Sequence, residues 1–126
     1  MDAVLHLVHY LAGCPKLGLF IPASTSSTLT AYCNADWGSC VDTHQSLSWY
    51  CILLGNALIS WKTKKQSTVS RSTVEAEYRS LGATVCDLQW LSYLLKDFHV
   101  AIRTPISLYS DNQAALNIVS NPVFHE

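Results

Sequence analysis

A long amphipathic stretch between two groups of β-type segments constrains the fold of this chain more than any other feature. It begins at Ser72-Thr73-Val74-Glu75, the capping-box pattern of a helix N-terminus, with Ser72 as N-cap and Glu75 three residues on. Apolar residues then recur at helical spacing at Val74, Tyr78, Leu81, Val85, Leu88, Leu91 and Leu95. We therefore expect one helix from Ser72 to about Phe98.

Three segments before this helix have the pattern of β-strands. They span residues 28–35, 47–54 and 57–61. A polar turn at 42–45 separates the first two, and Gly55-Asn56 is a tight-turn signal between the last two. Because connections this short join antiparallel neighbours, the three segments should form an antiparallel meander.

A fourth strand, Ile106–Tyr109, follows the long helix. Ser110-Asp111-Asn112-Gln113 then gives a second capping pattern, with Ser110 as N-cap of a helix over 114–119 that Asn121-Pro122 ends. A helix that joins two strands of one sheet is a crossover, which makes those strands parallel. The predicted fold class is α/β: a mixed sheet of three antiparallel strands, a crossover helix, a parallel fourth strand at or near the sheet edge, and a helix.

The first residues form a separate unit. Val4, Leu5, Val8, Leu11 and Ala12 lie at helical spacing within residues 3–12. Gly13 and Pro15 end this helix, and residues 23–28 form a loop that is almost entirely Ser and Thr. We therefore divide the chain into an N-terminal appendage with its linker, residues 1–27, and a domain over residues 28–126.

Composition narrows the setting of this domain. The 126 residues are 49% hydrophobic with a formal net charge of −1, so disorder is excluded and overall charge gives nucleic-acid binding no support. The five cysteines show no Cys-x-x-Cys spacing, which argues against a disulfide framework or a zinc site. No signal peptide or apolar run of membrane-spanning length is found. We expect an intracellular protein, cytoplasmic or nuclear and not secreted, without a membrane partner.

Three short strings place acidic or amide side chains where apolar runs meet polar segments. They are Asn34-Ala35-Asp36-Trp37, Glu75-Ala76-Glu77-Tyr78-Arg79 and Tyr109-Ser110-Asp111-Asn112-Gln113. Carboxylates brought from separate elements to one point repel each other unless cations lie between them, and oxygen ligands of this kind suit a pair of Mg²⁺ ions. The string at the first strand has Asn34 where a carboxylate is wanted.

The candidate ligands can be ranked by geometry. Glu77 lies about 200° around the helix from Glu75, so the two cannot face one ligand. Since the capping box already uses Glu75, we assign Glu77 and Asp111 to catalysis and metal binding. Asp36 shares the strand face of Asn34 but lies roughly 6.5–7 Å further along, which makes it the less favourable substitute.

A basic stretch forms a second candidate site. Lys62, Lys64, Lys65 and Arg71 lie close together in the sequence, which is most often a solvated turn. The functional interpretation is a phosphate clamp beside the free N–H groups at the helix start. The candidate nucleic-acid-binding residues are therefore Lys62, Lys64, Lys65, Arg71, Ser72, Asn112 and Gln113.

The strings together resemble the ribonuclease H domain of copia-type LTR retrotransposon polyproteins. The resemblance also rests on Ile59-Ser60-Trp61-Lys62, Val69-Ser70-Arg71-Ser72 and Asn121-Pro122-Val123-Phe124-His125, in the same order. Residues 3–21, with His9-Tyr10-Leu11-Ala12-Gly13, resemble the end of the reverse transcriptase region that precedes this domain.

The resemblance implies a ribonuclease H-like fold, two Mg²⁺ ions and hydrolysis of the RNA strand of RNA–DNA hybrids. The family's helix Glu falls on Glu77, its third acid on Asp111 and its first Asp on Asn34, which removes one negative charge. Its fourth acid falls beyond the last residue, so the expected fold is truncated at the C-terminus. We expect either a degenerate ribonuclease H of weak or no activity, or a non-catalytic nucleic-acid-binding or structural module. The implied partners are the hybrid and the reverse transcriptase region of the same polyprotein.

Overall fold

The computed structural model describes residues 2–23 and 26–121 and has the expected α/β architecture. The helices are α1 (Asp2–Gly13), α2 (Thr73–Asp97) and α3 (Gln113–Ser120). The strands are β1 (Thr28–Asp36), β2 (Leu47–Leu54), β3 (Ala57–Lys65) and β4 (Arg103–Tyr109). Residues 122–125, which carry the end of the last family motif, lie outside the described residues, as do residues 24 and 25 of the predicted loop.

The four strands form one mixed sheet in the order β3-β2-β1-β4. Strands β1, β2 and β3 are antiparallel neighbours, and β4 is parallel to β1, as a crossover through α2 requires. Strand β4 is an edge strand, so the prediction of its place is confirmed. Gly55 begins the β2–β3 turn at a φ of 57°, in the left-handed region that glycine adopts without strain.

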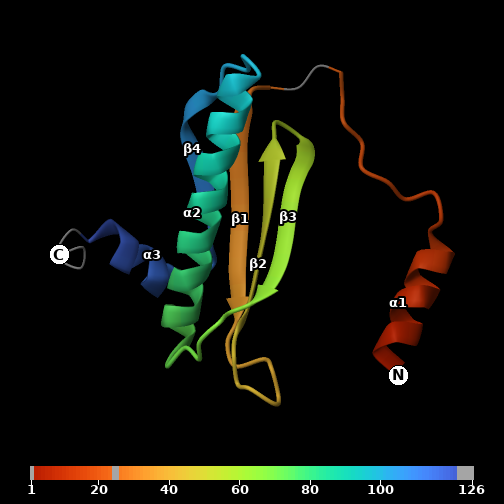
Figure 1. Ribbon diagram of the computed structural model, residues 1–126, viewed down its shortest axis with the longest axis vertical. Coiled ribbons are helices and arrows are strands. Elements are labelled where there is room, and N and C mark those ends of the chain that lie inside the picture. Colours follow the sequence, from red (N-terminus) through yellow and green to blue (C-terminus); the bar gives the residue numbers. More distant parts are fainter. Residues whose placement is uncertain (1, 24–25, 122–126) are drawn as a thin grey trace.

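Helix α2 covers one face of the sheet, and α3 packs against α2 (Figure 1). The core between α2 and the sheet follows the period-two alternation of β1 and β2 on one side and the helical stripe of α2 on the other. Its buried residues include Leu29, Ala31, Cys33, Tyr50, Ile52, Leu81, Leu88 and Leu91. This core fixes which side chains of β1 face the helix.

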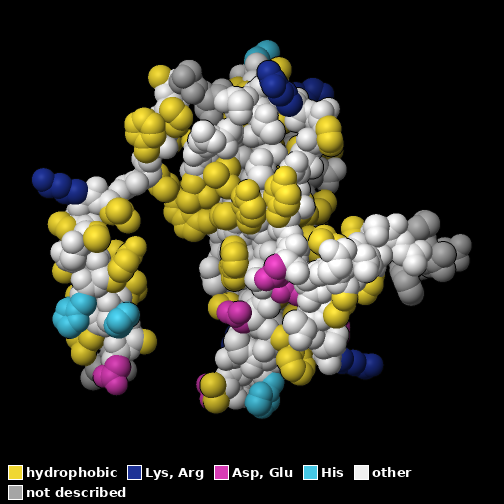
Figure 2. Space-filling model, turned by 180° about the vertical axis from the view of Figure 1, so that it is seen from behind, with side chains coloured by type: hydrophobic (Ala, Val, Ile, Leu, Met, Phe, Trp, Pro, Cys, Tyr) yellow, Lys and Arg dark blue, Asp and Glu magenta, His cyan; other side chains and the backbone are white. Residues whose placement is uncertain are grey.

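Helix α1 stands apart from the sheet in Figure 1 and has no buried residue. Its hydrophobic side chains, such as Val4, Leu7 and Leu11, are more than half exposed (Figure 2). The division of the chain into residues 1–27 and a domain over residues 28–126 stays a prediction. None of the helices in the described part of the chain has both the length and the apolar character needed to cross a bilayer.

Three predicted details were wrong. Strand β3 continues past Trp61 to Lys65 because all eight residues of β2 pair with it, so the lysines lie on a strand and not in a turn. Strand β4 begins at Arg103 and includes Pro105, an edge position where the missing N–H costs no ladder bond. The N-cap of α3 is Asn112, whose side chain accepts from the Ala115 N–H, and not Ser110.

Candidate active site and basic cavity

Strand β1 carries the first candidate residue near its C-terminal end. Side chains alternate along the strand, so Cys33 and Ala35 are buried toward α2, while Asn34 is partly exposed and Asp36 is exposed. Because β1 lies between β2 and β4, its C-terminal end is next to the end of the parallel strand β4. This places Asn34 beside the segment that contains Asp111.

Asn34 and Asp111 are in direct contact. The Asn34 Nδ2 group donates a hydrogen bond to Asp111 Oδ2 at 3.1 Å. The parallel pairing of Tyr32 with Tyr109 brings these strand ends together, and the two tyrosine rings stack with centroids 5.2 Å apart. The amide therefore already satisfies one oxygen of the carboxylate.

Glu77 reaches the same end of β1 from the opposite side. Its side chain is 3% exposed, its Oε1 accepts a hydrogen bond of 3.0 Å from the Ala35 N–H, and its Oε2 is buried with no hydrogen-bond partner. Burial raises the pKa of Glu77 above its ordinary value, the negative charges of Asp111 and Asp36 act in the same direction, and the Ala35 N–H opposes them. A buried carboxylate with an unpartnered oxygen is the one feature here that suits a positively charged partner.

Glu75 has the structural task that the sequence predicted. Its Oε2 accepts from the Arg71 N–H at 2.8 Å, one residue before the expected partner Ser72, while Ser72 Oγ accepts from the Glu75 N–H. Arg79 binds Glu75 Oε1, and these donors, the Arg71 N–H first, hold the pKa of Glu75 below its ordinary value. Glu75 and Glu77 thus point in different directions.

The donor set falls short of a two-ion site. Within residues 2–23 and 26–121, no three His, Cys, Asp or Glu side chains are grouped as they would be around a metal ion. We call the place where Asn34, Glu77 and Asp111 meet the junction. Among these three residues, only Glu77 and Asp111 supply carboxylates, and Asn34 presents an N–H group toward Asp111. Two Mg²⁺ ions carry four positive charges and prefer anionic oxygen ligands, so these residues do not fit such a pair. Mg²⁺ binding by Glu77, Asp111 or Asp36 stays a prediction.

The basic candidates divide into two groups. Lys62, Lys64 and Lys65 line a cavity beside α2, whereas Arg71 and Ser72 precede that helix and serve its cap. Near the third acid, Asn112 is the α3 N-cap, and the Gln113 side chain donates to Asn117 within the same helix. Nucleic-acid binding by these residues stays a prediction.

Two residues that organise this region escaped the sequence analysis. Ser80 Oγ donates to the Asn34 backbone oxygen at 2.9 Å and so ties α2 to β1 beside the acids. The Gln66 amide donates to Ser48 Oγ and to the Ala76 backbone oxygen, which joins β2 to the start of α2. Ser80 lies three residues after Glu77 on the same helix face, and that spacing could have identified it.

Comparison with known proteins supports the resemblance to retrotransposon polyproteins, without identifying the domain. The retrovirus-related Pol polyproteins from transposons RE2 and RE1 of Arabidopsis thaliana are 40% and 39% identical over 124 and 125 residues. That from transposon TNT 1-94 of Nicotiana tabacum is 29% identical over 124 residues. The chain is homologous to a short part of retrovirus-related Pol polyproteins. Nearly the whole chain is matched, but it spans only 8% of the length of the two Arabidopsis polyproteins. No family model and no solved structure matches it.

Proposed function

We propose that this Pol-like chain contains a ribonuclease H-like domain that binds RNA–DNA hybrids and does not hydrolyse them. The observation that carries the proposal is the hydrogen bond from Asn34 to Asp111, at the position where the family has a carboxylate. The strand order and the parallel β1–β4 pair support the ribonuclease H-like assignment. The match to Pol polyproteins supports a retrotransposon setting.

The loss of hydrolysis follows from charge. In two-metal hydrolysis, the ions activate water and stabilise the entering and leaving oxygens, and the protein must supply enough anionic ligands to hold both. Asn34 contributes no charge, which leaves Glu77 and Asp111 as the carboxylates beside it. Hence the residues present would hold the ions too weakly.

The appendage supports a place beside a polymerase. Helix α1 exposes apolar side chains that pack on nothing within the described residues. We expect these side chains to contact the reverse transcriptase region of the same polyprotein, since a contiguous apolar surface of this kind usually marks an interface.

A cleavage assay tests the proposal. A hybrid with labelled RNA is incubated with the protein in Mg²⁺ and, separately, Mn²⁺, with the Glu77→Ala variant as control. We expect no cleavage by either protein, while both retain binding of the hybrid. Hybrid-specific cleavage that disappears in Glu77→Ala would contradict the proposal, and so would failure of the unaltered chain to bind the hybrid.

A further inference from the structure

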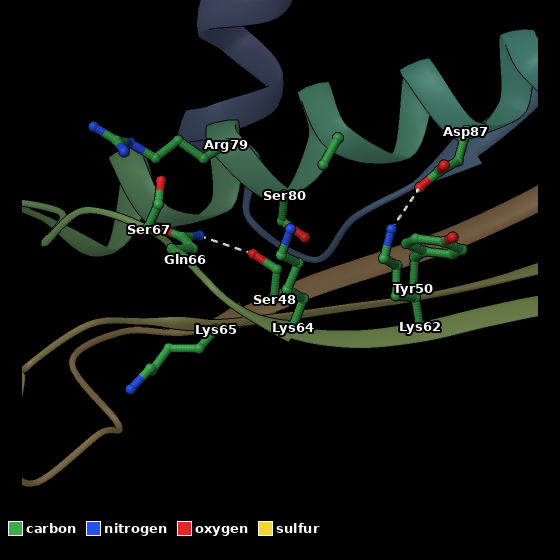
Figure 3. A pocket seen from close by; sticks show the side chains of 11 residues that line it. Ser48, Tyr50, Lys62, Lys64, Lys65, Gln66, Ser67, Arg79, Ser80 and Asp87 are labelled. Atoms are coloured by element: carbon green, nitrogen blue, oxygen red, sulfur yellow. Dashed lines mark hydrogen bonds and ion pairs between the residues drawn. The ribbon is translucent and has the colours of Figure 1, made fainter.

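The cavity lined by Lys62, Lys64 and Lys65 lies between α2 and the β2–β3 hairpin (Figure 3). No residue of the Asn34–Glu77–Asp111 junction lines it. Its volume is about 280 Å³. The lining side chains come from β2, β3, the segment after β3 and one side of α2: Ser48, Tyr50, Lys62, Lys64, Lys65, Gln66, Ser67, Arg79, Ser80, Ala83 and Asp87. The cavity is thus built by elements that the core already holds together.

The residues that line the cavity carry a positive charge that the chain as a whole does not. Four of the chain's eight Lys and Arg residues border the cavity, together with one acid, Asp87. The chain as a whole carries a formal net charge of −1, so the concentration of cations here is local. A concave surface of one charge sign attracts ligands of the opposite sign.

The four cations have different roles. The Lys62 ammonium pairs with Asp87 at 3.9 Å, Lys65 Nζ contacts Cys40 Sγ at 3.8 Å, and Arg79 binds Glu75. Figure 3 shows Lys64 directed toward α2 and Lys65 directed away from it. The Lys64 ammonium has no hydrogen bond or ion pair with any described residue, so its charge is available to an incoming anion.

Hydroxyl groups supply further donors beside Lys64. Ser48 Oγ accepts from Gln66 at 2.8 Å and so keeps its own hydrogen free to donate. The hydroxyl of Ser67 makes no bond in the described part of the chain. Ser48 and Lys64 are paired across β2 and β3, and Ser67 lines the same cavity. An ammonium and two hydroxyls that border one cavity suit an oxyanion that accepts in several directions, as a phosphate group does.

We propose that this cavity binds a backbone phosphate of a nucleic acid strand through Lys64, Ser48 and Ser67. The inference rests on the proposed function, because it takes the hybrid as the source of the phosphate. Ser80 connects the two places: it lines the cavity and donates to the Asn34 backbone oxygen, so both sites share one turn of α2. The cavity would hold the strand while the junction lies beside it.

Salt-dependent binding tests the cavity. Dissociation constants for a short RNA–DNA hybrid are measured over a range of salt for the parent chain, Lys64→Ala, Lys96→Ala and Asp87→Asn. Loss of one phosphate contact should reduce the slope of log K against log salt by about 1 in Lys64→Ala, with about fivefold weaker binding at low salt. Lys96 lies in the last turn of α2 and does not line the cavity, so Lys96→Ala removes the same charge elsewhere and should leave the slope nearly unchanged. Asp87→Asn releases Lys62 and should tighten binding.

A second measurement separates the cavity from the proposed function. Inorganic phosphate is titrated into ¹⁵N-labelled protein, and the amide shifts of residues 64–67 are followed. If the parent shows phosphate-induced shifts that are absent in Lys64→Ala and yet fails to bind the hybrid, the phosphate site is supported and the proposed function is overturned. If the hybrid binds with equal salt slopes in Lys64→Ala and Lys96→Ala, and phosphate shifts none of these amides, the proposed phosphate site is overturned and the proposed function stays intact.

Discussion

Replacing Asn34 by Asp should make the stability of the domain depend on Mg²⁺. The substitution removes the N–H donor that binds Asp111 Oδ2 at 3.1 Å and puts a second carboxylate in its place. Because this pair is exposed to solvent, the hydrogen bond contributes about 1 kcal/mol, and repulsion between two solvated charges at this distance adds about 1 kcal/mol. In EDTA, the free energy of unfolding of Asn34→Asp should therefore be about 2 kcal/mol below that of the parent.

Divalent cations should reverse this loss. A cation between the new Asp, Glu77 and Asp111 would stabilise the folded state by about 2.7 kcal/mol at a concentration one hundred times its dissociation constant. Urea unfolding followed by circular dichroism, in EDTA and along a Mg²⁺ titration, measures both effects. The parent should show no comparable response to Mg²⁺.

Asp36→Asn is the matched control, because it removes a carboxylate two residues away that makes no hydrogen bond with the described residues. It should change stability little and leave the response to Mg²⁺ as it was. Two results would refute the assignment of Asn34: equal stability of parent and Asn34→Asp in EDTA with no response to Mg²⁺, or a Mg²⁺ response of the parent that Asp36→Asn abolishes.

Three further predictions concern stability and reactivity. Glu77→Gln should raise the free energy of unfolding by about 1 kcal/mol at neutral pH, since it removes a buried charge. The folded-state pKa of Glu77 is raised, so the parent loses stability as pH rises from 4.5 through that pKa. In urea unfolding, the higher stability of Glu77→Gln over the parent should therefore vanish below pH 4.5. A stability difference that does not change with pH would contradict this. In thermal unfolding, Ser72→Ala should lower the free energy of unfolding by about 1 kcal/mol, because the N-cap hydrogen bond is lost. Ser92→Ala within α2 should not lower it. Burial raises the pKa of Cys33 to about 11, so a thiol reagent at pH 8 should modify exposed Cys86 rapidly and Cys33 only after unfolding; equal rates would show that Cys33 is accessible.

The elements that local pattern specifies were predictable from sequence. The capping box at Ser72, the Gly55-Asn56 turn and the alternation along residues 47–54 each correspond to an observed element. The separation of Glu75 from Glu77 followed from helical geometry alone, and the hydrogen bonds to Arg71 and Ala35 agree with it. Metal binding by Glu77 stays a prediction.

Features that depend on contacts between separate elements could not be predicted from the sequence. Nothing local extends β3 past Trp61, because residues 62–65 are polar; the extension depends on pairing with β2. Ser110 and Asn112 are both good N-caps, and the choice depends on where β4 ends and how the chain then turns. The basic stretch with Lys62, Lys64 and Lys65 was found in the sequence, but the cavity was not. Lys64 and Arg79 are distant in sequence, and only the packing of α2 on the hairpin brings both to one cavity.

The position of Asp111 depends on the two most lightly attached elements of the domain. Among the elements that the structure describes, β4 pairs with β1 alone, at the sheet edge, and α3 has its contacts with α2. The meander and α2 can therefore remain folded while β4 and α3 open together, and backbone amides of residues 103–120 should exchange with solvent through such local opening before the amides of β1 do. Glu77 is buried and bonded to the central strand β1, whereas Asp111 follows an edge strand, so we expect Glu77 to be held in place when Asp111 is not. The junction between them exists only in the fraction of molecules in which the edge is closed.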